Sequence, residues 1–104
     1  MTPLLYDQLV PFYHLLDPLE DHADEATEYG DVLLGAVPGA SSLLELGAGV
    51  GNGAHFIGER FASVTLTDLS PAMLERSRVT NPDYEHLVGD MRTLRLGRAF
   101  DCVL

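Results

Sequence analysis

The segment Leu43–Gly53 constrains the fold more than any other part of the chain. It reads LLELGAGVGNG, in which an apolar run leads through an acidic residue into a glycine-rich turn. Glycine permits positive φ angles and a close approach of the backbone to a ligand. The first N–H groups of a following helix are free to bind a polar group. The segment therefore predicts a strand, a nucleotide-cofactor loop and then a helix, with Gly47, Ala48, Gly49 and Gly51 as loop residues.

The loop alone leaves the identity of the cofactor open. Residues Gly49–Ala54 also match the GxGxxG/A pattern of dinucleotide-binding proteins. Glu45 lies just before the glycines and places negative charge beside the ligand, which favours a cofactor with cationic groups and opposes a pyrophosphate. Glu45 is therefore the main observation against an NAD-dependent oxidoreductase, an alternative that the glycine pattern and Asp68 support.

Length and composition favour one domain over residues 1–104. The chain has 104 residues, of which 46% are hydrophobic, and ordinary domains run to about 100–150 residues. It has neither an apolar run of about 18 residues nor a basic segment followed by an apolar one, so we expect no membrane partner and a cytoplasmic location. The single cysteine, Cys102, cannot form an internal disulfide and is expected to be a buried apolar residue.

Acidic side chains are concentrated at the front of the chain. Residues 1–50 hold nine acidic side chains and no Lys or Arg, whereas residues 51–104 hold seven acidic side chains and six Arg. Such a surface repels phosphate backbones, so nucleic acid is not an expected partner. The acidic run from Asp17 to Asp31 is expected to be a solvated helix face. The four histidines show no metal-ligand spacing, so no metal site is predicted.

Alternating helices and strands predict a Rossmann-like α/β fold. An amphipathic helix over 21–37, with Ala26, Gly30, Leu33 and Val37 on one side, ends the N-terminal helical segment 1–40. Two short helical pieces are expected before it, separated near Pro11. The cofactor-binding half, 41–104, is expected to contain strands at 42–46, 64–67, 84–88 and 100–104 and helices at 53–61 and from Pro71, capped by Ser70. Right-handed crossovers then give a doubly wound parallel sheet with helices on both faces.

Acidic residues stand at the ends of three predicted strands: Glu45, Asp68 and Asp90. Asp68 follows Gly49 by 19 positions and ends the next strand, where a carboxylate can accept hydrogen bonds from two vicinal hydroxyls. Asp68 also fits a plainer role as a cap for the following helix. Asp90, after the third strand, fits an ordinary loop acid as well as a ligand contact.

The region from Leu43 to Leu104 resembles the class I S-adenosylmethionine-dependent methyltransferases. The stretch Glu45–Gly51 looks like the ExGxGxG loop of the family, and Thr67–Leu74 is similar to its second motif. Residues Gly89–Met91, followed by Phe100–Leu104, look like the third motif and the fourth strand. The combination is far more specific than the loop alone.

The resemblance implies S-adenosyl-L-methionine as the cofactor and a role for each matched residue. The glycine backbone would pack against the methionyl part, and Asp68, with Leu69 beside it, would bind the ribose hydroxyls. Asp90 would accept a hydrogen bond from the adenine amino group, with Met91 beside the ring. No catalytic residue is assigned, because transfer from a sulfonium mainly requires an aligned acceptor.

The opening Tyr6–Leu16 is similar to that of many small-molecule methyltransferases, in which a repeated Tyr-Asp is common, although His14 replaces the second Asp. We expect Tyr13 to fold over the cofactor cleft, the alternative being that both tyrosines pack on the sheet. The resemblance implies methyl transfer to an O or N atom of a small metabolite. Residues 81–98 also resemble methyltransferases of amino sugars, without defining a substrate.

The family's sheet normally continues beyond a fourth strand, so this chain is expected to be the front half of a domain. The strand near Cys102–Leu104 would then be an open edge through which copies of the chain can associate. A third possibility is a non-catalytic fragment that needs a partner to complete its sheet.

Overall fold

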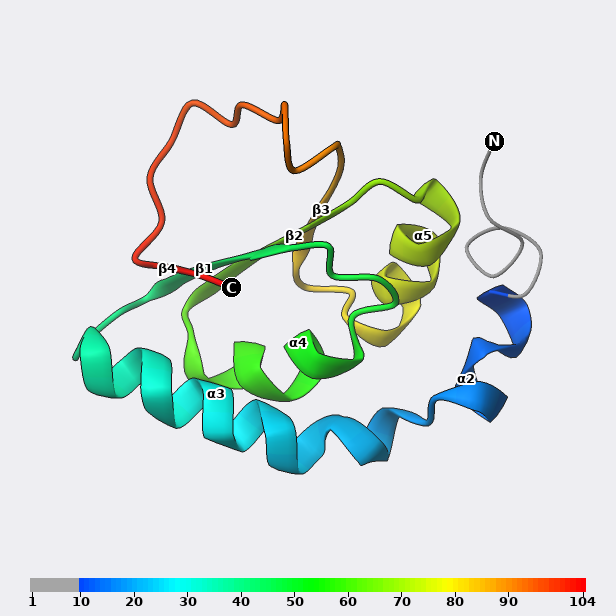
Figure 1. Cartoon of the computed structure of the whole chain (residues 1–104), viewed down its shortest axis with the longest axis horizontal. Coiled ribbons are helices and arrows are strands. Elements are labelled where there is room, and N and C mark those ends of the chain that lie inside the picture. Colours follow the sequence, from blue (N-terminus) through cyan, green and yellow to red (C-terminus); the bar gives the residue numbers. More distant parts are fainter. Residues whose placement is uncertain (1–9) are drawn as a thin grey trace.

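Four parallel strands form a single sheet in the computed structural model, which describes residues 10–104 apart from the side chains of Pro11, Tyr13 and Leu16. The strands lie in the order β3-β2-β1-β4 (Figure 1). Their bounds are β1 Ser42–Leu46, β2 Ser63–Asp68, β3 Glu85–Val88 and β4 Cys102–Val103. This arrangement confirms the predicted Rossmann-like α/β fold.

The fourth strand is shorter than the predicted 100–104. Asp101 uses its carboxylate to accept hydrogen bonds from the N–H groups of Ser41 and Ser42, at 2.9 and 3.2 Å. Backbone pairing begins only at Cys102, and Leu104 continues it with one bond to Leu44 and one from Leu46. Hydrogen bonds to the Asp101 side chain thus replace the backbone pairing that was expected at the start of this strand.

Helices precede the sheet and connect its strands. Before β1 lie η1 Val10–Phe12, α2 Tyr13–Leu16, η2 Leu19–His22 and α3 Ala23–Ala36; between the strands lie α4 Asn52–Ile57, η3 Gly58–Arg60 and α5 Pro71–Thr80. The predicted helix at 21–37 therefore begins with a 3₁₀ turn. The expected cap of α5 is confirmed, because Ser70 Oγ accepts the N–H of Met73 at 3.2 Å. The helical piece expected before Val10 lies outside the described residues.

The helices α3, α4 and α5 pack on one face of the sheet. The connections β1-α4-β2 and β2-α5-β3 step across the sheet in the same direction, so right-handed crossovers place both helices on the same side. Leu66 and His86 are register partners and face this side. Leu66 packs in the core with α4, whereas His86 Nε2 lies 2.8 Å from Ser77 Oγ of α5. Helix α3 then packs on α4.

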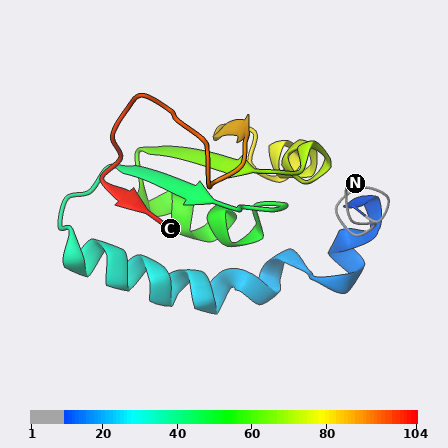
Figure 2. The ribbon, with the colours of Figure 1, turned by 45° about the horizontal axis from the view of Figure 1, so that its top comes forward.

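The opposite face is crossed by residues 89–101, which connect β3 to β4. Figure 2 shows this segment, in orange to red, on the side of the sheet away from α3. Arg98 pairs with Glu85 of β3 and donates to Thr65 Oγ1 of β2 at 3.5 Å. We expected helices on both faces, but in the described part of the chain this face has none. The strand order reverses between β1 and β4, so a right-handed connection from β3 to β4 runs over the other face of the sheet. This connection begins with a turn at Asp90, whose carbonyl accepts the N–H groups of Thr93 and Leu94, and it does not continue as a helix.

The core lies between the sheet and the helices. Its buried residues include Leu43 and Leu66 from the strands and Ala54 and Ile57 from α4. Cys102 belongs to the same cluster, as expected for a small apolar side chain. Across residues 10–104, none of the helices has the length and apolar character needed to cross a bilayer.

Candidate cofactor site

A cavity of about 300 Å³ opens at the carboxyl ends of β1 and β2. In sheets of this type, ligands bind beyond these ends, near the point where the strand order reverses. Here the order reverses between β1 and β4. One wall comes from the sheet side: Glu45, Gly47, Ala48, Gly49, Val50, Asp68 and Leu104. The other residues come mainly from the segments before β1 and from the start of α4.

The glycine loop adopts the conformation that its sequence predicted. Gly47, Gly49 and Gly51 have φ angles of 67°, 61° and 76°, in the left-handed region that side chains disfavour. A Cβ on Gly51 would lie 2.2 Å from Ser77 Oγ and 2.5 Å from Asn81 Nδ2. The N–H of Ala48 donates to the carbonyl of Thr67 at 2.9 Å and holds the loop against β2. The loop is thus a tight backbone wall for the cavity.

Asp68 connects the glycine loop to the next helix. Its Oδ2 accepts the N–H of Gly49 at 2.7 Å, and its Oδ1 accepts the N–H of Ser70 at 2.9 Å. The carboxylate therefore lines the cavity and also holds the residue that caps α5, while its expected role in binding ribose stays a prediction. A carboxylate has further lone pairs for a ligand hydroxyl.

Glu45 presents a buried oxygen without a partner. Within the described residues, its Oε2 is the buried side-chain atom that has no hydrogen bond. Burial, reinforced by the neighbouring Asp68 carboxylate, raises the pKa of Glu45 to about 7. A buried polar atom of this kind costs free energy unless a ligand satisfies it. Glu45 is therefore suited to a donor or cation held in the cavity.

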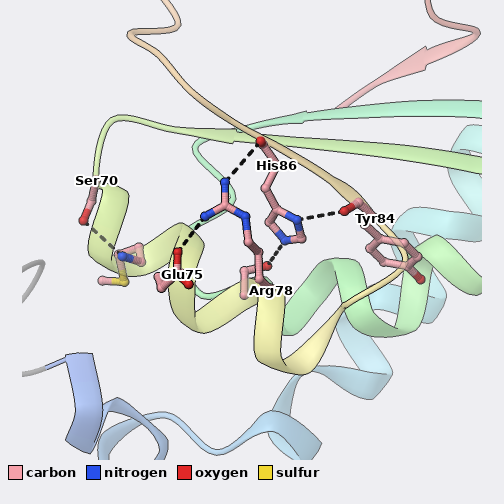
Figure 3. Close-up of polar contacts among 7 residues, drawn as sticks. Ser70, Glu75, Arg78, Tyr84 and His86 are labelled. Atoms are coloured by element: carbon pink, nitrogen blue, oxygen red, sulfur yellow. Dashed lines mark hydrogen bonds and ion pairs between the residues drawn. The ribbon is translucent and has the colours of Figure 1, made fainter.

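A hydrogen-bond network supports the loop from behind. Asn81 Nδ2 donates to the carbonyl of Gly51 at 3.0 Å and to Ser77 Oγ at 3.3 Å. His86 Nε2 lies 2.8 Å from Ser77 Oγ, and His86 Nδ1 lies 2.8 Å from the carbonyl of Tyr84 (Figure 3). The carbonyl oxygen of Tyr84 can only accept a hydrogen bond, so Nδ1 of His86 carries the proton. Nε2 of neutral His86 then accepts a hydrogen bond from the Ser77 hydroxyl. Burial lowers the pKa of His86, which favours this neutral form.

Four predicted site residues do not line the cavity: Gly51, which packs against Ser77 and Asn81 instead, and Leu69, Asp90 and Met91. The Asp90 carboxylate is engaged by Arg92, whose Nη2 lies 2.6 Å from Oδ2, and these bonds lower the pKa of Asp90 to about 2. The side chain of Leu69 is exposed. Met91 is also exposed, although its Cε lies 3.1 Å from the position of a Cβ on Gly47. The side chain of Tyr13 lies outside the described residues, so its expected position stays a prediction.

The sequence interpretation missed the wall formed by residues before β1. Asp17, His22, Glu25 and Tyr29 line the cavity, as does Asn52 at the start of α4. Asp17 and Glu25 belong to the acidic run that we expected to be a solvated helix face. No spacing in the sequence relates them to the glycine loop, because they reach it only through packing of η2 and α3 on α4.

Residues 43–104 match the family of methyltransferase domains. The chain belongs to this family. The match covers the sheet, the glycine loop and Asp68, and it confirms the resemblance to class I methyltransferases found in the sequence.

Curated relatives and solved structures agree with this assignment. Over 85 residues the chain is 36% identical to the dTDP-3-amino-3,4,6-trideoxy-alpha-D-glucopyranose N,N-dimethyltransferase of Streptomyces venezuelae, a match that covers 82% of this chain and 36% of the relative. A dTDP-3-amino-3,6-dideoxy-alpha-D-glucopyranose N,N-dimethyltransferase of Streptomyces fradiae is 34% identical, with 81% of this chain and 33% of the relative covered. The chain therefore spans about a third of the length of these relatives.

Among solved structures, the chain is similar to the S-adenosylmethionine-bound amino pentose methyltransferase CalS10 of Micromonospora echinaspora. The TM-score is 0.76 and the sequence identity 40%, with 78% of this chain and 34% of that chain covered. The chain thus shares both fold and sequence with part of that protein.

Proposed function

We propose that the protein takes part in S-adenosylmethionine-dependent transfer of a methyl group to an amino nitrogen of a small, sugar-like metabolite. The observation that carries the proposal is the unpartnered Oε2 of Glu45 in the cavity beside the glycine loop. The choice of an amino nitrogen rests on the names of the two Streptomyces relatives and of CalS10.

The residues of the cavity fit this cofactor. When bound, S-adenosylmethionine supplies a methyl group activated by a positively charged sulfur. Its ammonium group matches the buried oxygen of Glu45, which has no partner in the described residues. At Gly49 the space around a Cβ position is open, so a ligand can approach the backbone of the loop there. A pyrophosphate, in contrast, would face the carboxylates of Glu45 and Asp68.

We assign the ribose contact to Asp68 and the adenine end to the segment that starts at Asp90. Asp68 is anchored by Gly49 and Ser70, so its carboxylate has a fixed position from which to accept hydroxyl donors. Met91 lies close enough to Gly47 to border a ring held beside the loop. Asp90 would reach an adenine amino group only after exchanging some of its bonds to Arg92.

Calorimetric titration of the purified chain with S-adenosylhomocysteine tests the proposal. We expect saturable binding that Asp68→Ala weakens about tenfold or more, because a charge-assisted hydrogen bond to the ligand is lost. NAD serves as the control ligand and should not bind. Binding of NAD with no binding of S-adenosylhomocysteine would overturn the proposed cofactor and with it the proposed reaction.

A further inference from the structure

We propose that His22 binds the carboxylate of the cofactor's methionyl group and thereby forms the cationic half of a site for an amino-acid zwitterion. The inference rests on the proposed function and deepens it. Glu45 supplies the anionic half, and both side chains line the same cavity.

The charges around the cavity point to His22. Among the described residues that line it, the acidic side chains are Asp17, Glu25, Glu45 and Asp68, and none of the Arg residues is present. The chain contains no Lys. A ligand that carries both an ammonium and a carboxylate needs a partner for each charge, since an unpaired charge in a partly buried site is costly. Among the lining side chains in residues 10–104, His22 is the one that can become positively charged.

Asp17 holds the imidazole of His22 in place. His22 Nε2 lies 2.7 Å from Asp17 Oδ1, and both side chains are about two-thirds buried, with 28% and 34% of their surfaces exposed. Protonated His22 can donate from both nitrogens, so Nδ1 can serve a ligand carboxylate while Nε2 remains on Asp17. The Asp17 carboxylate is already engaged by this hydrogen bond, and the exposed Glu25 is screened by solvent.

The pair is also connected to the glycine loop. Asn52 follows Gly51 directly, and its Nδ2 donates to the carbonyl of Asp17 at 3.1 Å. His22 further stands at the N-terminus of the 14-residue helix α3, and its ring makes no capping bond to that helix. The partial positive charge at a helix start favours an anion at this position. The imidazole is therefore fixed relative to the loop and free to contact a ligand anion.

Two ligands that differ only in the charged tail test the assignment. S-adenosylhomocysteine carries the ammonium and carboxylate, whereas 5′-methylthioadenosine retains the adenosine and thioether without them. We expect His22→Gln to weaken the binding of S-adenosylhomocysteine about tenfold, because a charge-assisted hydrogen bond is lost. The affinity for 5′-methylthioadenosine should change less than about twofold, since that ligand has no carboxylate for His22 to bind. Asp17→Asn should lower the affinity for S-adenosylhomocysteine by a smaller factor, about threefold, and leave the affinity for 5′-methylthioadenosine unchanged.

The exposed His14 provides a matched control, and His14→Gln should leave both affinities unchanged. Equal affinity of His22→Gln and the unaltered chain for S-adenosylhomocysteine would overturn the role of His22. An equal loss for both ligands would also overturn it, because that result indicates a structural effect. Failure of the unaltered chain to bind either ligand would instead overturn the proposed cofactor, and with it the role of His22.

Discussion

The backbone N–H of Gly49 donates a 2.7 Å hydrogen bond to Oδ2 of Asp68, so the glycine loop after β1 is fastened to the end of β2. The same carboxylate accepts the N–H of Ser70 through Oδ1. One side chain thus fixes the loop and the start of α5, while it also lines the cavity. A substitution at this residue is therefore expected to change both the stability of the protein and the shape of the cavity.

Asp68→Ala should lower the free energy of unfolding by about 1–3 kcal/mol, because two backbone donors lose a charged acceptor. Urea denaturation followed by circular dichroism measures this change. The exposed Asp83 provides the control, and Asp83→Ala should shift stability by less than about 0.5 kcal/mol. Equal stability of the two variants would show that these backbone contacts contribute nothing.

Gly51→Ala should lower the free energy of unfolding by about 2–3 kcal/mol. The new methyl group would meet Ser77 Oγ and Asn81 Nδ2, and the φ angle of 76° is unfavourable for alanine. Gly35→Ala on the exposed side of α3 is the matched control, since no atom lies within 4 Å of its Cβ position. It should stabilise the protein by about 0.5–1 kcal/mol. A mild effect of Gly51→Ala in thermal melts would contradict the described geometry.

Glu45→Gln should make the protein more stable at pH 8 and leave its stability unchanged at pH 4. The folded state raises the pKa of Glu45 from 4.5 to about 7, so the folded protein binds its proton more tightly than the unfolded chain. The unaltered chain therefore loses stability as pH rises between these values, on the order of 3 kcal/mol in total. Glutamine does not ionise and removes this loss. A difference between the two proteins that is constant from pH 4 to 8 would refute the prediction.

Ser77→Ala should lower the free energy of unfolding by about 1–3 kcal/mol, because His86 Nε2 and Asn81 Nδ2 each lose a partner within the packed interior. The substitution should also weaken the binding of S-adenosylhomocysteine, since Ser77 positions Asn81, which holds the carbonyl of Gly51 in the loop. Denaturation and calorimetry measure the two effects. Ser63→Ala, at an exposed position on β2, should change neither quantity.

Local sequence patterns were sufficient to predict most of the elements from Ser42 onward. The apolar run that becomes β1, the glycines with positive φ and the Ser70 cap act within a few residues, and the structure shows each of them. The position of Asp68 at the end of β2 followed from the length of one crossover unit. These features depend on backbone conformation and hydrogen bonding between near neighbours.

Tertiary packing decided the remaining features. Successive right-handed crossovers in one direction placed α4 and α5 on the same face, which the order of elements alone did not reveal. The pKa of Glu45 depends on burial and on the charge of Asp68, which comes from another strand. The pair formed by Asp17 and His22 reaches the cavity because the N-terminal helices pack on α4, and the sequence contains no periodic signal for that contact. The sequence by itself thus determined the loop and its strands, while the tertiary structure decided which distant charged residues surround the cavity.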